Sequence, residues 1–355
     1  MLSFFVGSYT KSINPEAVCV GHGIYSLMLN TDTGGIVSLS TENCCNPSYL
    51  ITSENGEFLY CITELNELDA PQIIAYKIND GFSLSFLNKR SINGGYPCHL
   101  EKFDSNILVA CYGTGNVIRF PLESSGRLQV GKENYYHEGS GAVMNRQESP
   151  HAHQIAIQPV TSNIYVCDLG IDCIKAYSLK EGKLYPNAHN DFKMPDGSGP
   201  RHLVFNKNGD LAYVLNELSG AVSVLRNENG SFKSLYAYSS LPGKYFGKPS
   251  SSAIRLHPKG LFLYTANRVL EAITIFKVMK DQLLLVGFHY TNGKELREFN
   301  ISPDGKWLIA CHQNSHDIVV FRIKENGTLM EVSRTKKMKS PVCVAFSRVD
   351  LYASV

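Results

Sequence analysis

Hydrophobic residues along this chain occur in short runs that are separated by polar, turn-forming residues. The stretch 202–215 is typical: "HLVF" and "LAYVL" are apolar runs, and "NKNGD" between them has the Asn-Gly composition of a tight turn. Runs this short, rich in Val, Leu, Phe and Tyr, favour β-strands over helices. The pattern therefore predicts pairs of short strands joined by tight turns.

The same pair of strands recurs along the whole chain. Seven segments repeat it, and the residues that we take as equivalent lie 50, 53, 50, 49, 47 and 45 positions apart. These residues are Pro47, Pro97, Pro150, Pro200, Pro249, Leu296 and Pro341. Third strands such as "IIAYKI" and fourth strands led by a turn, such as "GTLMEVSRTKK", follow the pairs. Four short strands in a unit of this length are typical of a β-propeller blade.

The chain is therefore predicted to be all-β, with one domain over residues 1–355 that has seven blades of four antiparallel strands. "SFFVGSYT" near the N-terminus resembles a second strand, and "PVCVAFSR" near the C-terminus resembles a first strand. We expect the two ends to share one blade and close the ring, which removes the exposed edge of an open sheet. A pair of β-sandwiches is the alternative, and seven copies in register argue against it. The final "DLYASV" does not fit this scheme neatly.

Composition and charge exclude several classes of function. The formal net charge is +2, so no charge excess indicates binding to nucleic acid or to an anionic membrane. No apolar run is long enough for a membrane span, and the N-terminus lacks the cationic start of a signal peptide. The ten cysteines include no C-x-x-C pair, and Cys61, Cys111, Cys167 and Cys311 lie within apolar strand patterns. We expect buried, reduced thiols in a cytoplasmic protein.

Polar residues that interrupt the repeat mark a candidate functional site. The first strand of each propeller blade lines the central channel, so first-strand starts and second-strand ends surround one mouth of it. The residues that stand out there are His153, Arg201, His202, Glu217, Arg268, Arg297, Gln313, Ser315 and His316. Arginines, a glutamate and a histidine at one mouth are typical of a site that binds an anion and transfers protons.

The same residues also have structural interpretations. Arg201 could hydrogen-bond loop carbonyl groups, and Glu217 could be its structural ion-pair partner. His151 and His153 are two positions apart on a strand, so both would point the same way and could bind a metal ion. No carboxylate or third histidine is placed beside them, and we predict no metal site. His99 in "PCHL" is interpreted as structural.

The chain resembles a known family, the seven-bladed propeller lactonases, which include bacterial 6-phosphogluconolactonases and the fungal carboxy-muconate cyclase. The resemblance covers essentially the whole chain and is carried by "VGSYT", "GSGPRH", "YVLNEL", "HPKGLFLYTANR" and "FNISPDGKWLIACHQNSHDIVVFRI". In the sixth copy "LREF" keeps Arg297 but lacks the usual proline. Ala253 and Val269 replace a common acidic residue and a common glycine. These departures leave the substrate open.

The resemblance implies catalytic roles for His153, Arg201, Glu217 and Arg268. The further residues that we expect to bind substrate are His151, His202, Arg297 and Gln313. The implied reaction is hydrolysis of a sugar-acid lactone, above all 6-phospho-D-glucono-1,5-lactone of the pentose phosphate pathway, with no metal or cofactor. His153 is the expected base because its ordinary pKa is near neutrality, and Glu217 is the alternative. The arginines would bind the oxyanion or an anionic group of the substrate.

Three other functions are compatible with the same residues. A muconate-type cycloisomerase would use the arginines on carboxylates and one acid to move a proton. A propeller can also serve as a non-catalytic platform for binding proteins. A calcium-dependent sugar lactonase would need several inward Asp, Asn and Glu ligands. For the favoured function, we expect a small anionic sugar lactone as the partner and a monomer or weak homodimer as the state of the protein.

Overall fold

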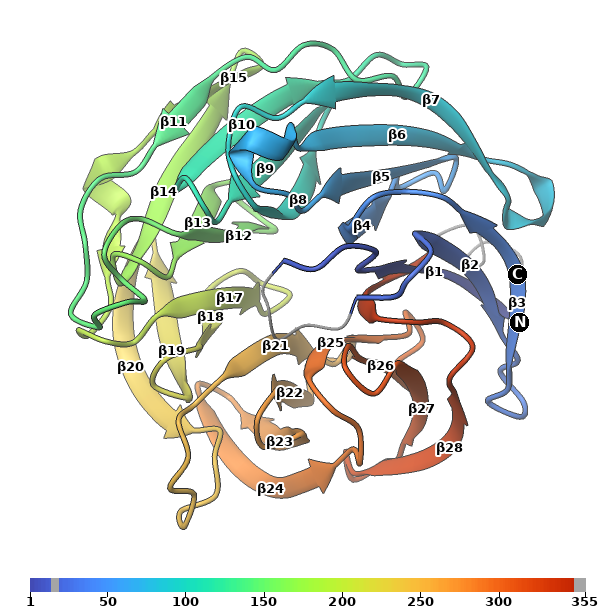
Figure 1. Cartoon of the computed structure of the whole chain (residues 1–355). Helices are drawn as coiled ribbons and strands as arrows, with labels where there is room; N and C mark the ends of the chain where they lie inside the picture. Colours follow the sequence, from blue (N-terminus) through green and yellow to red (C-terminus); the bar gives the residue numbers. More distant parts are fainter. Residues whose placement is uncertain (14–18, 348–355) are drawn as a thin grey trace.

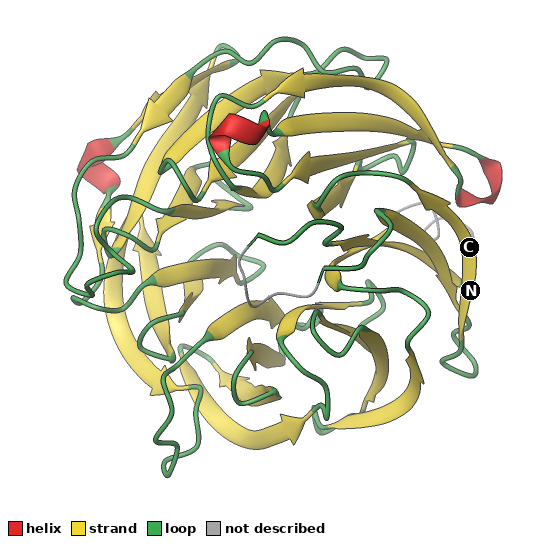
Figure 2. Ribbon diagram, viewed as in Figure 1, coloured by secondary structure: helices red, strands yellow, loops and turns green. Residues whose placement is uncertain are grey.

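The computed structural model describes residues 1–13 and 19–347 and shows seven β-sheets arranged as blades around a central axis (Figures 1 and 2). The predicted seven-bladed propeller is confirmed. The last residues, including "DLYASV", lie outside the described part of the chain. In the part that is described, the only helices are three 3-10 turns, η1 (Glu67–Asp69), η2 (Asp80–Phe82) and η3 (Ala188–Asn190).

The first three blades follow one another in the sequence, each with its innermost strand first. Blade 1 contains β4 (Pro47–Thr52), β5 (Phe58–Thr63), β6 (Gln72–Ile78) and β7 (Leu84–Ser91). Blade 2 contains β8 (Pro97–Phe103), β9 (Asn106–Cys111), β10 (Asn116–Pro121) and β11 (Asn134–Tyr136). Blade 3 contains β12 (Ala152–Ile157), β13 (Ile164–Asp168), β14 (Cys173–Lys180), β15 (Lys183–Pro186) and β16 (Phe192–Lys193).

The remaining blades repeat the order. Blade 4 contains β17 (Pro200–Phe205), β18 (Leu211–Asn216), β19 (Ala221–Glu228) and β20 (Ser231–Ser239). Blade 5 contains β21 (Ser251–Leu256), β22 (Phe262–Asn267), β23 (Ala272–Met279) and β24 (Gln282–Tyr290). Blade 6 contains β25 (Leu296–Ile301), β26 (Trp307–His312), β27 (Asp317–Ile323) and β28 (Leu329–Thr335). Blade 7 contains β29 (Pro341–Phe346), β1 (Leu2–Ser8), β2 (Ile24–Leu29) and β3 (Ile36–Glu42).

Blade 7 closes the ring as the sequence predicts. Its innermost strand β29 comes from the C-terminal region and pairs antiparallel with β1, with Phe4 opposite Phe346 and Val6 opposite Val344. Strands β2 and β3 then complete the blade from the N-terminal side. Backbone hydrogen bonds between the two ends of the chain therefore hold the circle together.

The hydrophobic core is divided among the seven interfaces between neighbouring blades. Each buried cluster contains residues of two adjacent blades, as where Trp307 and Ile309 of β26 pack with Phe4 and Leu27 of blade 7. Second strands such as β22 are buried along their whole length because a blade packs on each face. The outermost strands are largely exposed or half-buried, as in β24. This explains why second strands form continuous apolar runs in the sequence.

Blade 3 departs from the four-strand rule. Its outer edge is split between β15 and β16, which both pair with β14. Pro186 ends β15, and the short turn η3 follows before the chain returns to pair again. Proline has no backbone N–H to continue a ladder, which accounts for the interruption.

Two of the seven residues that the repeat analysis took as equivalent are corrected by the strand register. Ala152 pairs opposite Asp168 and Ser251 opposite Asn267, in the way that Pro47 pairs opposite Thr63. The equivalent positions in blades 3 and 5 are therefore Ala152 and Ser251, two residues after Pro150 and Pro249. In these two blades the proline lies in the turn before the innermost strand and is not the first residue of that strand.

Two rings of residues surround one mouth of the central channel. The pairing of every innermost strand shifts just after its first residue, and the second residues form what we name the bulge ring. The bulge ring consists of Ser48, Cys98, His153, Arg201, Ser252, Arg297 and Val342. The residues that directly follow the second strands form what we name the mouth ring. It consists of Tyr9, Glu64, Tyr112, Leu169, Glu217, Arg268 and Gln313.

One backbone hydrogen bond places the two rings together in all seven blades. The N–H of each mouth-ring residue donates to the carbonyl of the residue that precedes the innermost strand of the same blade. In blade 4, for example, Glu217 N–H donates to Gly199 O at 2.7 Å, and in blade 5 Arg268 N–H donates to Ser250 O at 2.9 Å. A side chain at either position is therefore directed to the same end of the channel by the fold itself.

The closure of the ring gives a first prediction. A Cβ atom on Gly7 of β1 would lie 1.9 Å from the carbonyl oxygen of Pro47, the first residue of β4 in the next blade. Gly7→Ala should therefore lower the free energy of unfolding by about 1–3 kcal/mol, because backbone must move to relieve the contact. Urea unfolding measures the change. Gly243→Ala is the control, since a Cβ there meets no atom within 4 Å. Equal stability of the two variants would contradict the close approach of blades 7 and 1.

Candidate active site

A cavity of about 330 Å³ lies at the mouth where the two rings meet. Its lining residues are Ile13, Glu64, Tyr96, Cys98, Tyr112, Arg146, His153, Glu217, Arg268 and Arg297. Seven of these ten belong to the bulge ring or the mouth ring, and Ile13 belongs to residues 9–13, which follow β1 and lie over the centre of the ring in Figure 1. The cavity is thus built from many blades, and no single blade contains the site.

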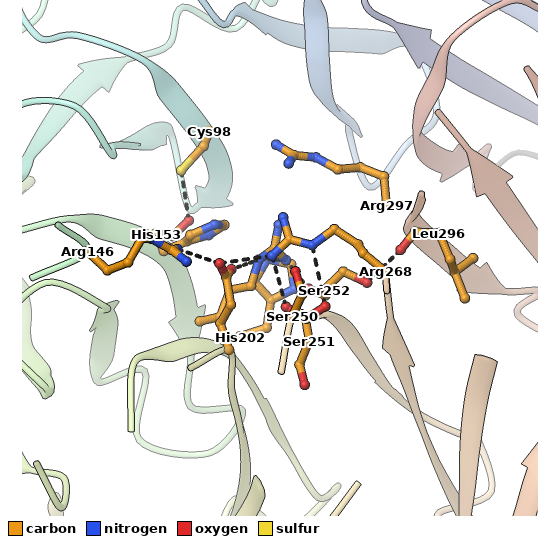
Figure 3. Close-up of polar contacts among 12 residues, drawn as sticks. Cys98, Arg146, His153, His202, Ser250, Ser251, Ser252, Arg268, Leu296 and Arg297 are labelled. Carbon is orange, nitrogen blue, oxygen red and sulfur yellow. Dashed lines mark hydrogen bonds and ion pairs between the residues drawn. The ribbon is translucent and has the colours of Figure 1, made fainter. Parts of the chain in front are cut away.

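Glu217 is the centre of the charged network in this cavity. Its Oε1 lies 2.9 Å from Arg268 Nη2 and 2.6 Å from Arg146 Nη2. Its Oε2 lies 3.0 Å from Arg201 Nε, close enough for an ion pair, although the Nε–H does not point at a hydrogen-bond acceptor. Figure 3 shows Arg146 and Arg268 approaching from opposite sides. One buried carboxylate is therefore paired with three guanidinium groups.

The arginines determine the charge state of Glu217. Burial alone would raise the pKa of its carboxyl, but Arg268, Arg201 and Arg146 together lower that pKa well below its ordinary value. Burial and the neighbouring Arg268 in turn lower the pKa of Arg201 to about 10. Glu217 is therefore ionised at neutral pH and is a weak base. This argues against the alternative in which Glu217 takes the proton of the attacking water.

Arg201 is held below the cavity. Its Nη1 donates to the carbonyl of Ser252 in the next blade and lies 3.0 Å from His202 Nε2. With Nε 3.0 Å from Glu217 Oε2 as well, this guanidinium is in contact with the protein on several sides. We conclude that Arg201 positions Glu217 and His202, while Arg268 and Arg297 line the cavity itself.

His153 is the only histidine that lines the cavity in the described part of the chain. Its Nδ1 is buried without a hydrogen-bond partner, and its ring is perpendicular to Tyr112 with the centroids 5.7 Å apart. Cys98 Sγ donates to the backbone carbonyl of His153 at 3.2 Å. Burial, and then the charge of Arg201, lower the pKa of His153 well below 6.5, partly opposed by Glu217. The imidazole is neutral at pH 7 and able to accept a proton.

Two further histidines continue below His153 into the channel. The ring of His202 lies 5.3 Å from that of His153, and the ring of His99 lies 6.1 Å from that of His202. All three are buried, and burial lowers the pKa of each one well below 6.5. His99 packs on Tyr49 at 4.2 Å and accepts the N–H of Ile155 at 3.4 Å, consistent with its structural interpretation.

A second buried carboxylate lies across the cavity. Tyr9 donates its hydroxyl to Glu64 Oε2 at 2.7 Å and accepts Arg297 Nη2 at 2.8 Å. Arg297 Nη2 is also 3.6 Å from Glu64 Oε1, and its guanidinium lies over the ring of Tyr9. Arg297 is thereby held at the wall of the cavity (Figure 3). The thiol of Cys98, beside this group, is neutral because burial raises its pKa, and it is no nucleophile at pH 7.

The structure brings together most of the residues that the sequence suggested. His153, Glu217, Arg268 and Arg297 line the cavity, and Arg201 and His202 lie in the constriction below it.

The cavity lining does not include His151, Gln313, Ser315 or His316. His151 stacks on Tyr112 with the ring centroids 4.3 Å apart, and its Nδ1 lies 2.8 Å from Tyr112 O. Gln313 is a buried mouth-ring residue. The bulge at His153 interrupts the strand alternation that would have paired it with His151.

Other residues of the site escaped the sequence analysis, although one had a signal. Glu64 follows "FLYCIT" as Glu217 follows "LAYVLN", so the repeat alone places both at the mouth. Tyr9, Cys98 and Tyr112 occupy the same two rings, but their side chains did not stand out as charged. Arg146 lies on a loop between blades, where the repeat carries no information.

No group of three His, Cys, Asp or Glu side chains within residues 1–13 and 19–347 could hold a metal ion. In the same residues, no helix has the length and hydrophobicity needed to cross a membrane. All ten cysteines are free thiols, and the four expected in apolar strands are buried.

Comparison with known proteins identifies the family. The family model for lactonases with a seven-bladed β-propeller matches residues 3–346. The chain belongs to this family. A 6-phosphogluconolactonase of Bacillus subtilis is 34% identical over 352 residues, which cover 96% of this chain and 97% of that protein. Another, from Formosa agariphila, is 32% identical over 340 residues, covering 92% and 94%.

A solved structure supports the same assignment. The periplasmic gluconolactonase of Pseudomonas aeruginosa superposes with a TM-score of 0.91 at 25% sequence identity, covering 98% of this chain and 99% of that one. The fold is thus the same over nearly the full length. The protein is accordingly a lactonase of the propeller type, and the four residues implied by the resemblance lie at or just below one cavity.

The Glu217 network gives a second prediction. Glu217→Gln removes the charge that three arginines share, and it should lower the free energy of unfolding by about 3–5 kcal/mol. Asp281→Asn is the matched control, because it removes the partly exposed partner of Arg226, 3.0 Å away, and should cost about 1 kcal/mol or less. Urea unfolding of both variants measures the difference, and similar costs would show that Glu217 is not the centre of the network.

The buried histidines give a third prediction, on pH. His153, His202 and His99 protonate more readily in the unfolded chain than in the folded one, so stability is full above pH 6.5 and falls as pH decreases below it. Each contributes a slope of up to about 1.4 kcal/mol per pH unit. Urea midpoints at pH 7.5 and 5.5 should differ strongly, and His99→Asn should reduce the difference. A stability that does not change between these two pH values would contradict the neutral state of the three rings.

Proposed function

We propose that this protein hydrolyses 6-phospho-D-glucono-1,5-lactone to 6-phosphogluconate. The observation that carries the proposal is the buried network of Glu217 and its three arginines beside a neutral histidine. Around the cavity and the constriction below it, the arginines outnumber the glutamates by one: Arg146, Arg201, Arg255, Arg268 and Arg297 against Glu64, Glu217, Glu295 and Glu298. The surplus of positive charge favours an anionic substrate. The relatives named 6-phosphogluconolactonase support the same substrate.

The proposed reaction begins with attack of water on the lactone carbonyl carbon. Neutral His153 accepts a proton from the water as the new C–O bond forms, and the carbonyl oxygen becomes an oxyanion. Arg268 and Arg297, which line the cavity, stabilise this negative charge through their N–H donors. The bond from the carbonyl carbon to the ring oxygen then breaks, and protonated His153 returns the proton to that oxygen. The product acid ionises and releases one proton to solvent.

The low basicity of His153 suits a reactive substrate. A group with a lowered pKa is a weak base, so it assists water only moderately, but it gives its proton up readily to the leaving oxygen. Glu217 takes no proton in this scheme. It keeps Arg268 fixed at the cavity wall, so that the donors are oriented before the oxyanion forms. Catalysis then rests more on preorganised charge than on a strong base.

A second candidate substrate is an unphosphorylated aldonolactone. The similarity to the periplasmic gluconolactonase of Pseudomonas aeruginosa, with a TM-score of 0.91, favours it. The surplus of arginines argues for the phosphorylated compound. The cytoplasmic location that we expected from the sequence stays a prediction. A direct comparison of the two lactones decides between them.

The fourth prediction tests the proposal with freshly generated 6-phosphogluconolactone, after subtraction of spontaneous hydrolysis. His153→Ala should reduce kcat/KM by about 10²- to 10⁴-fold because it removes the proton acceptor. Arg268→Gln should reduce it by about 10²- to 10³-fold through the oxyanion. Arg226→Gln, far from the cavity on β19, should retain full activity. A wild-type protein inactive on this lactone would refute the function, and an active His153→Ala variant would refute the assignment of the base.

A further inference from the structure

Arg146 differs from the other arginines of the site because it lies on a loop between two blades. It lies on the loop 137–151, which connects β11 of blade 2 to β12 of blade 3, and it belongs to neither ring. From there it reaches Glu217 of blade 4, 71 residues along the chain, and donates Nη2 to Oε1 at 2.6 Å (Figure 3). Its guanidinium also lies close to the side chain of Tyr112. A guanidinium from an inter-blade loop therefore completes the wall of the cavity.

The backbone that carries Arg146 is anchored. Gln147 N–H donates to Val143 O at 2.9 Å, and Val143 N–H donates to Gln147 Oε1 at 2.9 Å. Gln147 Nε2 in turn donates to Leu169 O of the mouth ring at 2.8 Å. Because this turn is fixed to blade 3, a change in the contacts of Arg146 requires only rotation of its side chain.

Arg146 is also the most accessible of the four guanidinium groups. The side chain is 40% exposed, against 4% for Arg201, 10% for Arg268 and 18% for Arg297. Its contact with Glu217 is therefore the one that water and solutes reach most readily, and the one that is exchanged at the smallest cost in desolvation. When Arg146 leaves Oε1, Arg268 remains on that oxygen and Arg201 beside the other, so Glu217 stays neutralised.

An exchange of this kind frees donors that fit an anion. Arginine has five N–H groups in a planar fork and binds a carboxylate or phosphate through two of them at once. The contacts with Glu217 and Tyr112 leave other N–H groups of Arg146 able to bind a ligand. Arg146 and His153 line the same cavity, His153 buried and the Arg146 side chain 40% exposed, so a ligand whose carbonyl lies near His153 and that extends toward the opening can reach Arg146.

We propose that Arg146 is the specificity-determining residue of the site: it exchanges Glu217 for the anionic group at the far end of the substrate. This inference rests on the proposed function for the identity of the substrate, a sugar lactone with a phosphate on its tail. Arg146 then selects the phosphorylated lactone by binding its phosphate, and it takes no part in the attack on the carbonyl.

The fifth prediction compares two lactones in two variants. Arg146→Gln should raise KM for 6-phosphogluconolactone by about tenfold to a hundredfold, the usual loss for a charge-assisted hydrogen bond, with kcat nearly unchanged. Its kcat/KM on glucono-1,5-lactone, which carries no phosphate, should fall by a much smaller factor. Arg146→Lys should recover only part of the loss, because it keeps the charge but not the fork. Arg226→Gln is the matched control, since Arg226 is 42% exposed and also pairs with one carboxylate, and it should change neither lactone's kinetics.

Equal losses on both lactones, or no change on the phosphorylated one, would overturn the role of Arg146 while leaving the lactonase function intact. A wild type that hydrolyses only the unphosphorylated lactone would overturn it as well.

If the wild type hydrolyses neither lactone, the proposed function fails, and calorimetric titration with inorganic phosphate tests the role of Arg146 separately. Binding that is weakened in Arg146→Gln but kept in Arg226→Gln supports the inference. Equal binding by all three proteins, or no binding by the wild type, overturns it.

Discussion

The site depends on one backbone hydrogen bond that is repeated in every blade. It joins the residue after the second strand to the residue before the first, so two positions per blade are delivered to the same mouth whatever side chains they carry. Seven blades supply fourteen such positions, and only a few carry charge. The fold thus provides a general frame, and the chemistry comes from substitutions within it, such as Arg201 and Glu217 in blade 4 and Arg268 in blade 5.

At this mouth the positive charges of the arginines exceed the negative charges of the glutamates. Glu217 and Glu64 each pair with arginines, most of them from other blades or loops, and the arginines in surplus create a positive potential inside the cavity. The same potential and the same burial keep His153 uncharged. A neutral imidazole beside fixed guanidinium groups can pass a proton to and fro without altering the charge that holds the ligand. The mechanism that we propose thus assigns binding and proton transfer to different residues.

The sequence predicted the architecture well because periodicity reports on it directly. Buried second strands such as "FLYTAN" recur at nearly constant spacing, and the turn-led strands around them complete each blade. Six of the eight residues proposed for the site lie at the cavity or in the constriction below it, for the same reason.

The predicted first residue of the innermost strand was wrong in blades 3 and 5. In the sequence, a proline in the turn before a strand cannot be distinguished from a proline at the start of the strand. The sequence did not indicate that His151 lies outside the cavity lining, because a bulge cannot be read from alternation. Arg146 could not be found, since its position depends on how a long loop folds across two blades.

The ring is closed by strands from opposite ends of the chain, and this sets an order for folding during synthesis. Blades 1 to 6 are each made of consecutive strands and can form as they leave the ribosome. Strand β1 emerges before any of them, but its partner β29 emerges after all of them. Until then β1 presents an unpaired edge, and the mouth lacks Tyr9, which joins Arg297 to Glu64. The candidate binding site is therefore completed only by the last strand. A chain that ends before β29 would carry most of the residues of the site but would not form the finished pocket.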